Sequence, residues 1–146
     1  PDDKRLMFSD KCVIRLSKCL SLNLKRNGRR TYITDDNKQG YLVTTSKMYN
    51  QKDKEKYWFG YRKDALKDLI FCDEKYVVFG CKDESILLKI PVSEIEKHLE
   101  NLNSSKDEDG NISHWHIVFL KDNDGNMTWM LSKPTIKEVP INQYLL

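Results

Sequence analysis

A chain of 146 residues, of which 32% are charged and 39% hydrophobic, has the size and composition of one folded domain. No apolar run approaches the length of a membrane span and no signal sequence is evident, so we expect a cytoplasmic protein with no membrane partner. The four cysteines show no close metal or redox spacing and are expected to be reduced, while the net charge of +3 permits an anionic partner without requiring one.

The chain begins Pro1-Asp2-Asp3-Lys4 without an initiator methionine. This start predicts a domain cut from a longer protein, whose effector domain would lie elsewhere in the parent chain. Nothing along the sequence indicates an internal boundary, so residues 1–146 are interpreted as a single domain.

The hydrophobic pattern predicts the elements in chain order. Apolar residues spaced three and four apart predict a helix over 9–25, with Ser9 as N-cap and Asn27-Gly28 as the stop. Strands at 31–33 and 41–49 are separated by turn-forming residues and predict a hairpin. Five further strands are predicted at 57–61, 76–80, 86–90, 114–121 and 126–132.

Two shorter helices complete the pattern. One is predicted over 63–71, and the capping box from Ser93 to Glu96 predicts another that ends near residue 102. Residues 103–113 are expected to form a polar loop, and the chain from Pro134 onward an extended tail. The continuous apolar character of 76–80 and 86–90 predicts burial on both faces.

These elements predict an α+β fold: a mixed, mainly antiparallel sheet or partly open β-barrel of about seven strands, with an N-terminal helix and two shorter helices. Barrel-like readers of modified bases, of the SRA, PUA or B3 kind, have a comparable order of elements. That comparison is an analogy of fold and does not by itself establish function.

A cluster of cations surrounds the turn at Asn27-Gly28. Lys25, Arg26, Arg29 and Arg30 can reach phosphates as point charges or as guanidinium forks. The alternative is that they complement the dipole of the preceding helix, although one or two cations would suffice for that.

The strand over 57–61 carries four aromatic rings. Alternation places Trp58 and Gly60 on one face and the other three rings on the opposite face, where they would form core. Trp58, with Lys47 and Arg62 near it, could instead line a surface that stacks on nucleobases or a pocket that receives a flipped base.

Metal and calcium sites are weaker interpretations. His114 and His116 share one face of a strand, but a third ligand is not evident, so hydrogen-bonded or exposed histidines are expected. The segments 107–111 and 122–126 resemble fragments of calcium loops without the distal glutamate and are interpreted as turns.

A nuclease would need clustered carboxylates to hold Mg²⁺. Asp35 or Asp36 precedes Lys47, and Asp73 or Glu74 precedes Lys82, but the position two residues before each lysine holds no carboxylate. We therefore assign no catalytic residue, no metal ligand and no cofactor.

Several short motifs carry a resemblance: Ser46-Lys47, Tyr57-Trp58-Phe59, Tyr76-Val77-Val78-Phe79-Gly80-Cys81, Ile90-Pro91, Leu102-Asn103 and Trp115-His116-Ile117. Their order resembles a domain of uncharacterised bacterial proteins associated with restriction and defence systems, over about 100 residues from Tyr41 onward. The family pattern has a histidine after the aromatic strand, where this chain has Arg62 or Lys63. The resemblance implies DNA as the partner.

The leading hypothesis is a non-catalytic DNA-recognition module of a prokaryotic restriction or defence protein, which would read a modified base or a specific site in double-stranded DNA. Its nucleic-acid-binding residues would be Lys25, Arg26, Arg29, Arg30, Lys47, Trp58 and Arg62. One alternative is a Mg²⁺-dependent PD-(D/E)XK-like nuclease domain. The other is a protein-interaction or oligomerisation domain.

Overall fold

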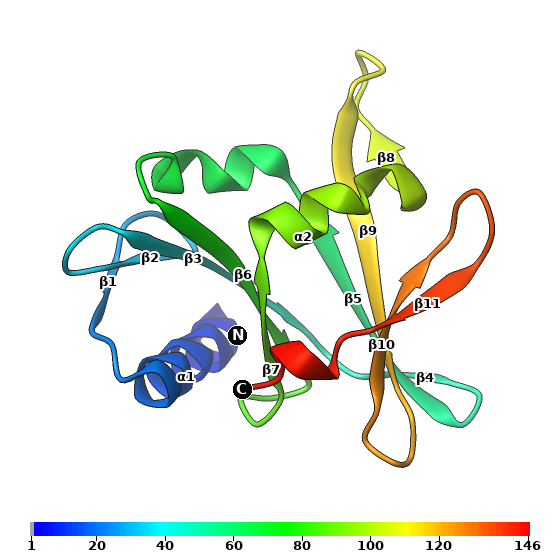
Figure 1. The fold of residues 1–146 in the computed structure, drawn as a ribbon, viewed down its shortest axis with the longest axis horizontal. Helices are drawn as coiled ribbons and strands as arrows, with labels where there is room; N and C mark the ends of the chain where they lie inside the picture. The colour runs from blue at the N-terminus through cyan, green and yellow to red at the C-terminus, as the bar shows by residue number, and fades with distance from the viewer. Residues whose placement is uncertain (1) are drawn as a thin grey trace.

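The computed structural model describes residues 2–146, with side chains from Phe8 onward. The helical segments in this range are α1 (Asp2–Leu20), η1 (Lys63–Leu69), α2 (Val92–Lys97), η2 (Leu99–Asn101) and η3 (Asn142–Tyr144), of which the η segments are 3-10 helices (Figure 1). The strands are β1 (Leu24–Arg26), β2 (Thr31–Thr34), β3 (Gln39–Ser46), β4 (Tyr49–Gln51), β5 (Lys54–Tyr61), β6 (Glu74–Cys81), β7 (Leu87–Pro91), β8 (Ser104–Lys106), β9 (Ile112–Lys121), β10 (Met127–Leu131) and β11 (Lys137–Pro140).

Two open sheets organise the chain. The first has the order β1-β2-β3-β6-β7 and is antiparallel except for the parallel pair β3 and β6. The second has the antiparallel order β11-β10-β9-β5-β4, with β8 also paired to β9. The α+β class with an N-terminal helix is thus confirmed. All seven expected strands are present, and the additional strands β1, β4, β8 and β11 have only three or four residues each.

The main core lies between the two sheets. The rings of Phe59 and Phe119 come from the second sheet and meet Phe79 of the first, with centroid separations of 4.8 Å and 4.9 Å to Phe79. Tyr57 and Tyr61 are buried on the same side of β5 as Phe59, whereas Trp58 is 39% exposed on the opposite side. The expected alternation of β5 is confirmed.

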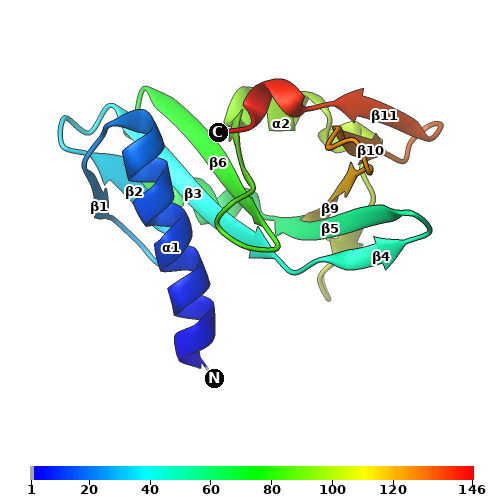
Figure 2. The same ribbon diagram turned by 90° about the horizontal axis from the view of Figure 1, so that it is seen from below.

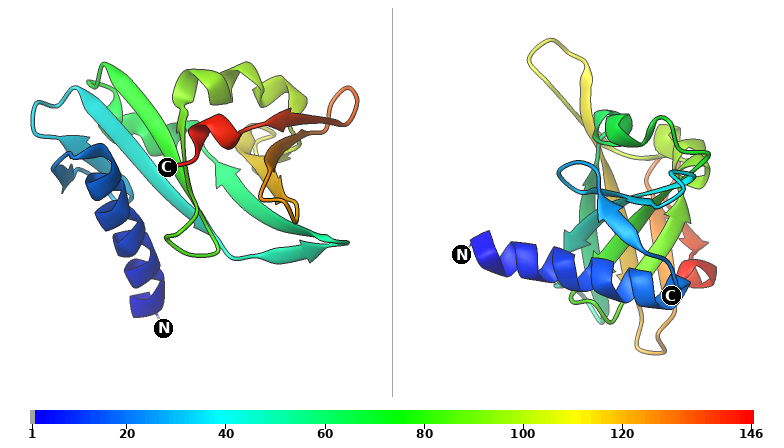
Figure 3. Two further views of the ribbon diagram at one scale, coloured as in Figure 1. Left: turned by 60° about the horizontal axis from the view of Figure 1, so that its bottom comes forward. Right: turned by 90° about the vertical axis from the view of Figure 1, so that its left-hand side faces the viewer.

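A smaller core lies between α1 and the outer face of the first sheet, where Cys12 and Leu16 pack near Tyr41 and Val78. Figure 2 shows α1 lying across β2 and β3 on the side away from the second sheet, and the right-hand view of Figure 3 shows the helix along its length, crossing in front of the strands. Because both faces of β6 and β7 contribute to a core, their expected double burial is confirmed. A side chain at Gly80 would approach the Cys12 sulfur to 2.7 Å, so glycine allows α1 to pack closely.

The expected end of the first helix is wrong. The helix ends at Leu20, where Ser21 adopts a left-handed φ of 54°. The Ser21 N–H donates to the Lys18 carbonyl at 3.3 Å and the Leu22 N–H donates to the Ser17 carbonyl at 3.1 Å, which is a Schellman termination. Ser9 lies inside α1 rather than capping it.

Three other local predictions also need correction. No side-chain cap opens α2, which begins at Val92 directly after Pro91, so the capping box does not form. The expected polar loop contains β8, and the expected tail contains β11 and η3. The two aspartate-rich segments are turns as expected, since Asp107 Oδ1 and Asp122 Oδ1 each accept two backbone N–H groups.

All four cysteines are free, and Cys19 is the exposed one. Within residues 2–146, no helix combines the length and the apolar character that crossing a membrane requires.

Candidate nucleic-acid interface

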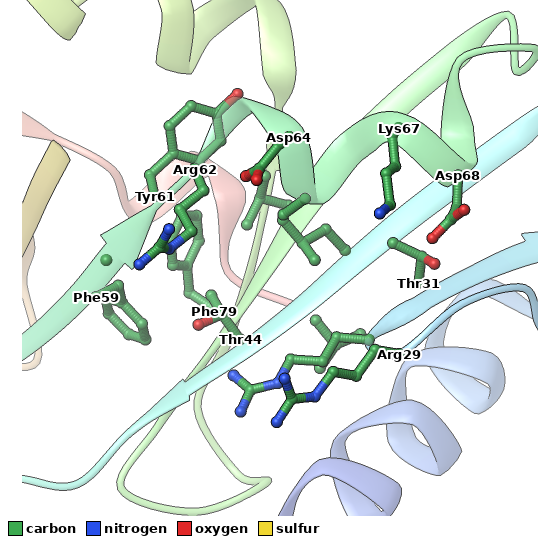
Figure 4. Close-up of a pocket in the computed structure, with 16 residues that line it drawn as sticks. Arg29, Thr31, Thr44, Phe59, Tyr61, Arg62, Asp64, Lys67, Asp68 and Phe79 are labelled. Carbon is green, nitrogen blue, oxygen red and sulfur yellow. The ribbon is translucent and has the colours of Figure 1, made fainter. Parts of the chain in front are cut away.

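A cleft of about 430 Å³ opens between the sheets beside η1 (Figure 4). Its apolar wall is formed by side chains of both sheets, including Leu42, Phe59, Val77 and Phe79. Its rim carries charged residues from the β1–β2 turn and from η1. The cleft therefore combines an apolar wall with a charged entrance, as small-ligand sites commonly do.

Four exposed cations line this cleft: Arg29, Arg30, Arg62 and Lys67. Figure 4 shows Arg62 and Lys67 on the η1 side and Arg29 on the opposite side. None of the four takes part in an ion pair within the part of the chain that the structure describes. The cations repel one another, and an anion placed among them would relieve that repulsion.

The turn that carries Arg29 and Arg30 is docked on η1. The Asn27 side-chain amide donates to the Asp68 carbonyl at 2.7 Å, and the Asn27 N–H donates to the Thr31 carbonyl at 2.9 Å. Gly28 has a φ of 153°, and a side chain there would collide with Thr31 Oγ1 and the Asp68 carboxylate. The Asn27-Gly28 sequence thus holds the two arginines over the cleft.

Lys25 and Arg26 do not line the cleft. Both lie on β1, so the expectation of four cations after a helix C-terminus is wrong, and the dipole alternative fails with it. The Arg26 guanidinium donates to the Gly28 carbonyl at 3.0 Å and to the Arg29 carbonyl at 2.7 Å. Arg26 therefore shapes the turn that presents Arg29.

Arg62 and Lys67 are brought to the cleft by η1. Arg62 is still extended, with φ −122° and ψ 131°, and its carbonyl accepts the first turn's hydrogen bond from Ala65 at 3.2 Å. Asp64, Lys67 and Asp68 follow at helical spacings and also line the cleft. The sequence reasoning missed these three residues, although their spacing within the expected helix at 63–71 is the signal that could have revealed them.

Trp58 lies on the other face of β5, away from the apolar wall of the cleft. Its indole Nε1 donates to His116 Nδ1 at 3.0 Å, and His116 Nε2 lies 2.8 Å from Ser105 Oγ. Lys47 is also outside the cleft, with its ammonium 5.3 Å from the centre of the Tyr49 ring. The predicted site residues thus separate into a cleft and an outer face.

His114 lies between these two regions. Its imidazole centroid is 4.9 Å from that of His116 and 6.3 Å from that of Trp58. The pKa of His114 is lowered, chiefly by desolvation and then by its electrostatic interactions with the His116 imidazole and the Arg62 guanidinium. Gly60 also lines the cleft, and a side chain there would lie 3.4 Å from both the His114 and Trp58 rings, so the cleft and the outer face are neighbouring parts of one surface.

Three of the motifs that carry the bacterial resemblance, those containing Ser46, Asn103 and His116, meet the Tyr57-Trp58-Phe59 motif around β5 and β9. Ser46 Oγ accepts the backbone N–H of Trp58 at 3.0 Å, and the His116 N–H donates to the Asn103 carbonyl at 2.9 Å. The register pairs Gly60 with His116 and Tyr61 with Trp115. These short motifs therefore support the position of Trp58 from several elements.

No protein-family profile matches the chain, and neither a curated protein nor a solved structure matches it significantly. The case for a function therefore depends on the geometry of this surface.

Asp36 and Asp73 are the carboxylates on which the nuclease hypothesis depends. The Asp36 carboxylate accepts hydrogen bonds from Thr34 Oγ1 at 2.7 Å and from the Lys38 N–H at 3.0 Å, and the Thr34 bond chiefly lowers its pKa. Across the described residues, no group of three His, Cys, Asp or Glu side chains is placed to hold a metal ion. Asp36 is accounted for by its turn, and the nuclease hypothesis gains no support.

Proposed function

We propose that this chain is a non-catalytic nucleic-acid-recognition module, with DNA as the expected partner. The observation that carries the proposal is the convergence of Arg29, Arg30, Arg62 and Lys67 on one cleft, where no described residue forms an ion pair with them. Structural cations on a protein surface do not need to gather in one place, whereas recognition of a phosphate by several cations brings them together.

The chemistry of the cleft suits a nucleotide unit. Guanidinium groups bind phosphate oxygens through paired hydrogen bonds, and Lys67 adds a mobile point charge. Asp64 and Asp68 can accept hydrogen bonds from base amino groups, while the apolar wall provides contact for a base or sugar. An acidic protein surface would satisfy the cations but would gain less from the two carboxylates.

The wider biological setting is part of the proposal. Membership of a restriction or defence protein, and an effector domain in the same parent chain, are expectations from the resemblance. The cleft supports the recognition role itself, because phosphate binding depends on charge and geometry and not on the parent protein.

The test is a charge reversal of Arg29 and Arg30 together, Arg29→Glu/Arg30→Glu. Removing two phosphate contacts should weaken DNA binding at least about tenfold and lower the slope of log affinity against log salt by about 2. Fluorescence anisotropy with a labelled DNA oligonucleotide, titrated at several salt concentrations, measures both quantities.

The matched control is Lys133→Glu/Lys137→Glu, which changes the net charge equally at two exposed lysines outside the cleft. The DNA affinity of this control variant should fall only by the small, nonspecific contribution that net charge makes to binding. Equal losses in the two double variants, or an unchanged salt slope in the arginine variant, would show that the cleft does not bind phosphates.

A further inference from the structure

Trp58 is an exposed aromatic ring that is nevertheless held in place. It is 39% exposed, its indole nitrogen donates to His116 at 3.0 Å, and its backbone N–H donates to Ser46 Oγ at 3.0 Å. Ordering a large side chain at the surface costs conformational entropy, and this ring gains less from burial than a core tryptophan would. A fixed, exposed indole is what a preorganised binding surface requires.

The hydrogen bonds define what His116 does. An indole nitrogen can only donate, so Nδ1 of His116 must accept. A neutral imidazole then carries its proton on Nε2, which donates to Ser105 Oγ at 2.8 Å. Both ring nitrogens are used, so in this arrangement His116 is neither a base for Ser105 nor a metal ligand. It is a positioning residue for the indole.

Trp58 belongs to an open sheet face. In Figure 2 and in the left-hand view of Figure 3, α2 lies on the core side of the second sheet, and no described helix covers the opposite side of β4 and β5. Tyr49 lies on the same face as Trp58, because it pairs with Lys56, which shares the Trp58 face of β5. The Tyr49 side chain is 43% exposed. Two exposed rings on adjacent strands therefore share one uncovered surface.

The charges on this face point to its occupant. The Lys47 ammonium lies 5.3 Å from the Tyr49 ring, and Lys56 is the cross-strand neighbour of Tyr49. Arg62, which lines the neighbouring cleft, directly follows β5. Lys54, on the same face of β5, forms an ion pair with the Glu138 carboxylate at 3.6 Å, so the charge of that carboxylate is already compensated. Aromatic rings interleaved with cations complement a chain of bases linked by phosphates. In a duplex the base faces are stacked on each other, so only unpaired nucleotides can stack on these rings.

We propose that the face around Tyr49, Trp58 and His116 is a stacking platform for unpaired nucleotides, so that the partner is single-stranded or locally unpaired nucleic acid. This inference rests on the proposed recognition function and specifies its substrate class. The strand would pass from the cationic cleft to the platform over Gly60, where a side chain would lie 3.4 Å from both the Trp58 and His114 rings.

The test compares wild type, Trp58→Ala and Trp58→Phe. Each is titrated with a labelled oligo(dT) of about 12 nucleotides and with oligo(dA)·oligo(dT) duplex of the same length, at fixed salt. Loss of the stacking ring should weaken single-strand binding about tenfold or more in Trp58→Ala and leave duplex binding within about twofold. Trp58→Phe should retain most single-strand affinity because it keeps a ring.

The role of His116 is tested separately by spectroscopy. Oligo(dT) should quench the tryptophan fluorescence of wild type, and this quenching should be absent in Trp58→Phe. His116→Phe keeps a ring but removes the acceptor, so it should reduce quenching and single-strand affinity while leaving duplex binding unchanged. Equal single-strand affinity and quenching in His116→Phe and wild type would refute its positioning role.

The outcomes separate the two proposals. If Trp58→Ala binds the single strand as tightly as wild type, or loses single-strand and duplex binding equally, the platform is wrong while the cleft can still bind DNA. If the wild-type chain binds neither nucleic acid even at low salt, the recognition function and the platform both fail. Thermal unfolding of each variant checks the fold, and substitution of the exposed Trp58 should change the unfolding temperature little.

Discussion

At the scale of single residues, the candidate site depends on Gly28. A methyl group there would collide with Thr31 Oγ1 and the Asp68 carboxylate, so the turn would have to move away from η1. Gly28→Ala should therefore cost about 1–3 kcal/mol of unfolding free energy and also weaken DNA binding, because Arg29 and Arg30 move with the turn. Urea denaturation and anisotropy measure the two effects.

Gly110→Ala is the matched control for this substitution. Gly110 also has a positive φ, 83°, but a side chain there would meet nothing within 4 Å. This variant should lose about 1 kcal/mol from backbone strain and keep its DNA affinity. If Gly28→Ala binds DNA as wild type does, the docked turn is not what positions the arginines.

At the scale of elements, the end of α1 decides where the cations of β1 lie. The Schellman termination places Ser21 in a left-handed conformation that costs a residue with a side chain more than it costs glycine. Ser21→Gly should therefore stabilise the protein by about 0.5–1 kcal/mol without changing the fold. Ser9→Gly, inside the helix, should instead destabilise it by a comparable amount. Chemical denaturation measures the unfolding free energy of both variants. Changes of the same sign in Ser21→Gly and Ser9→Gly would contradict the assigned helix end.

The same element shows why sequence reasoning failed there. Periodicity continued to residue 24 because Leu24 fits a helical spacing, yet Leu24 begins β1 and pairs with Thr34. Serine gives no strong stop signal, and the short strands form because a partner strand is already in place. By contrast, the alternation of residues 57–61 is a local property, and it correctly predicted which rings are buried and that Trp58 is exposed.

At the scale of the whole molecule, the candidate surface is assembled by contacts distant in sequence. Arg29 and Arg62 were identifiable as cations, but their meeting depends on the docking of a turn onto η1. The partnership of Trp58 with His116 depends on the β5–β9 register, which pairs Gly60 with His116. Neither long-range arrangement has a local signature, so the sequence indicated the residues without indicating their grouping.

Arg15 connects distant parts of the chain at this scale. Its guanidinium donates to the carbonyl oxygen of Glu84, which lies in the β6–β7 turn, at 2.8 Å. It also donates to the carbonyl oxygen of Leu146 at 2.9 Å. The Leu146 N–H in turn donates to the Leu87 carbonyl at 3.0 Å, so α1, the β6–β7 turn and the last residues of the chain are held together. Hydrogen bonds from a charged donor contribute more to stability than neutral ones.

Arg15→Ala should therefore lower the unfolding free energy by about 1–3 kcal/mol, since two carbonyl partners lose a charged donor. Lys18→Ala, an exposed cation of the same helix, should change it by less than about 0.5 kcal/mol. Urea denaturation measures both, and DNA affinity should remain unchanged in each because neither residue lines the cleft. A loss of DNA affinity in Arg15→Ala without a loss of stability would instead place the α1 face in the interface and require the proposed binding surface to be extended across the first sheet.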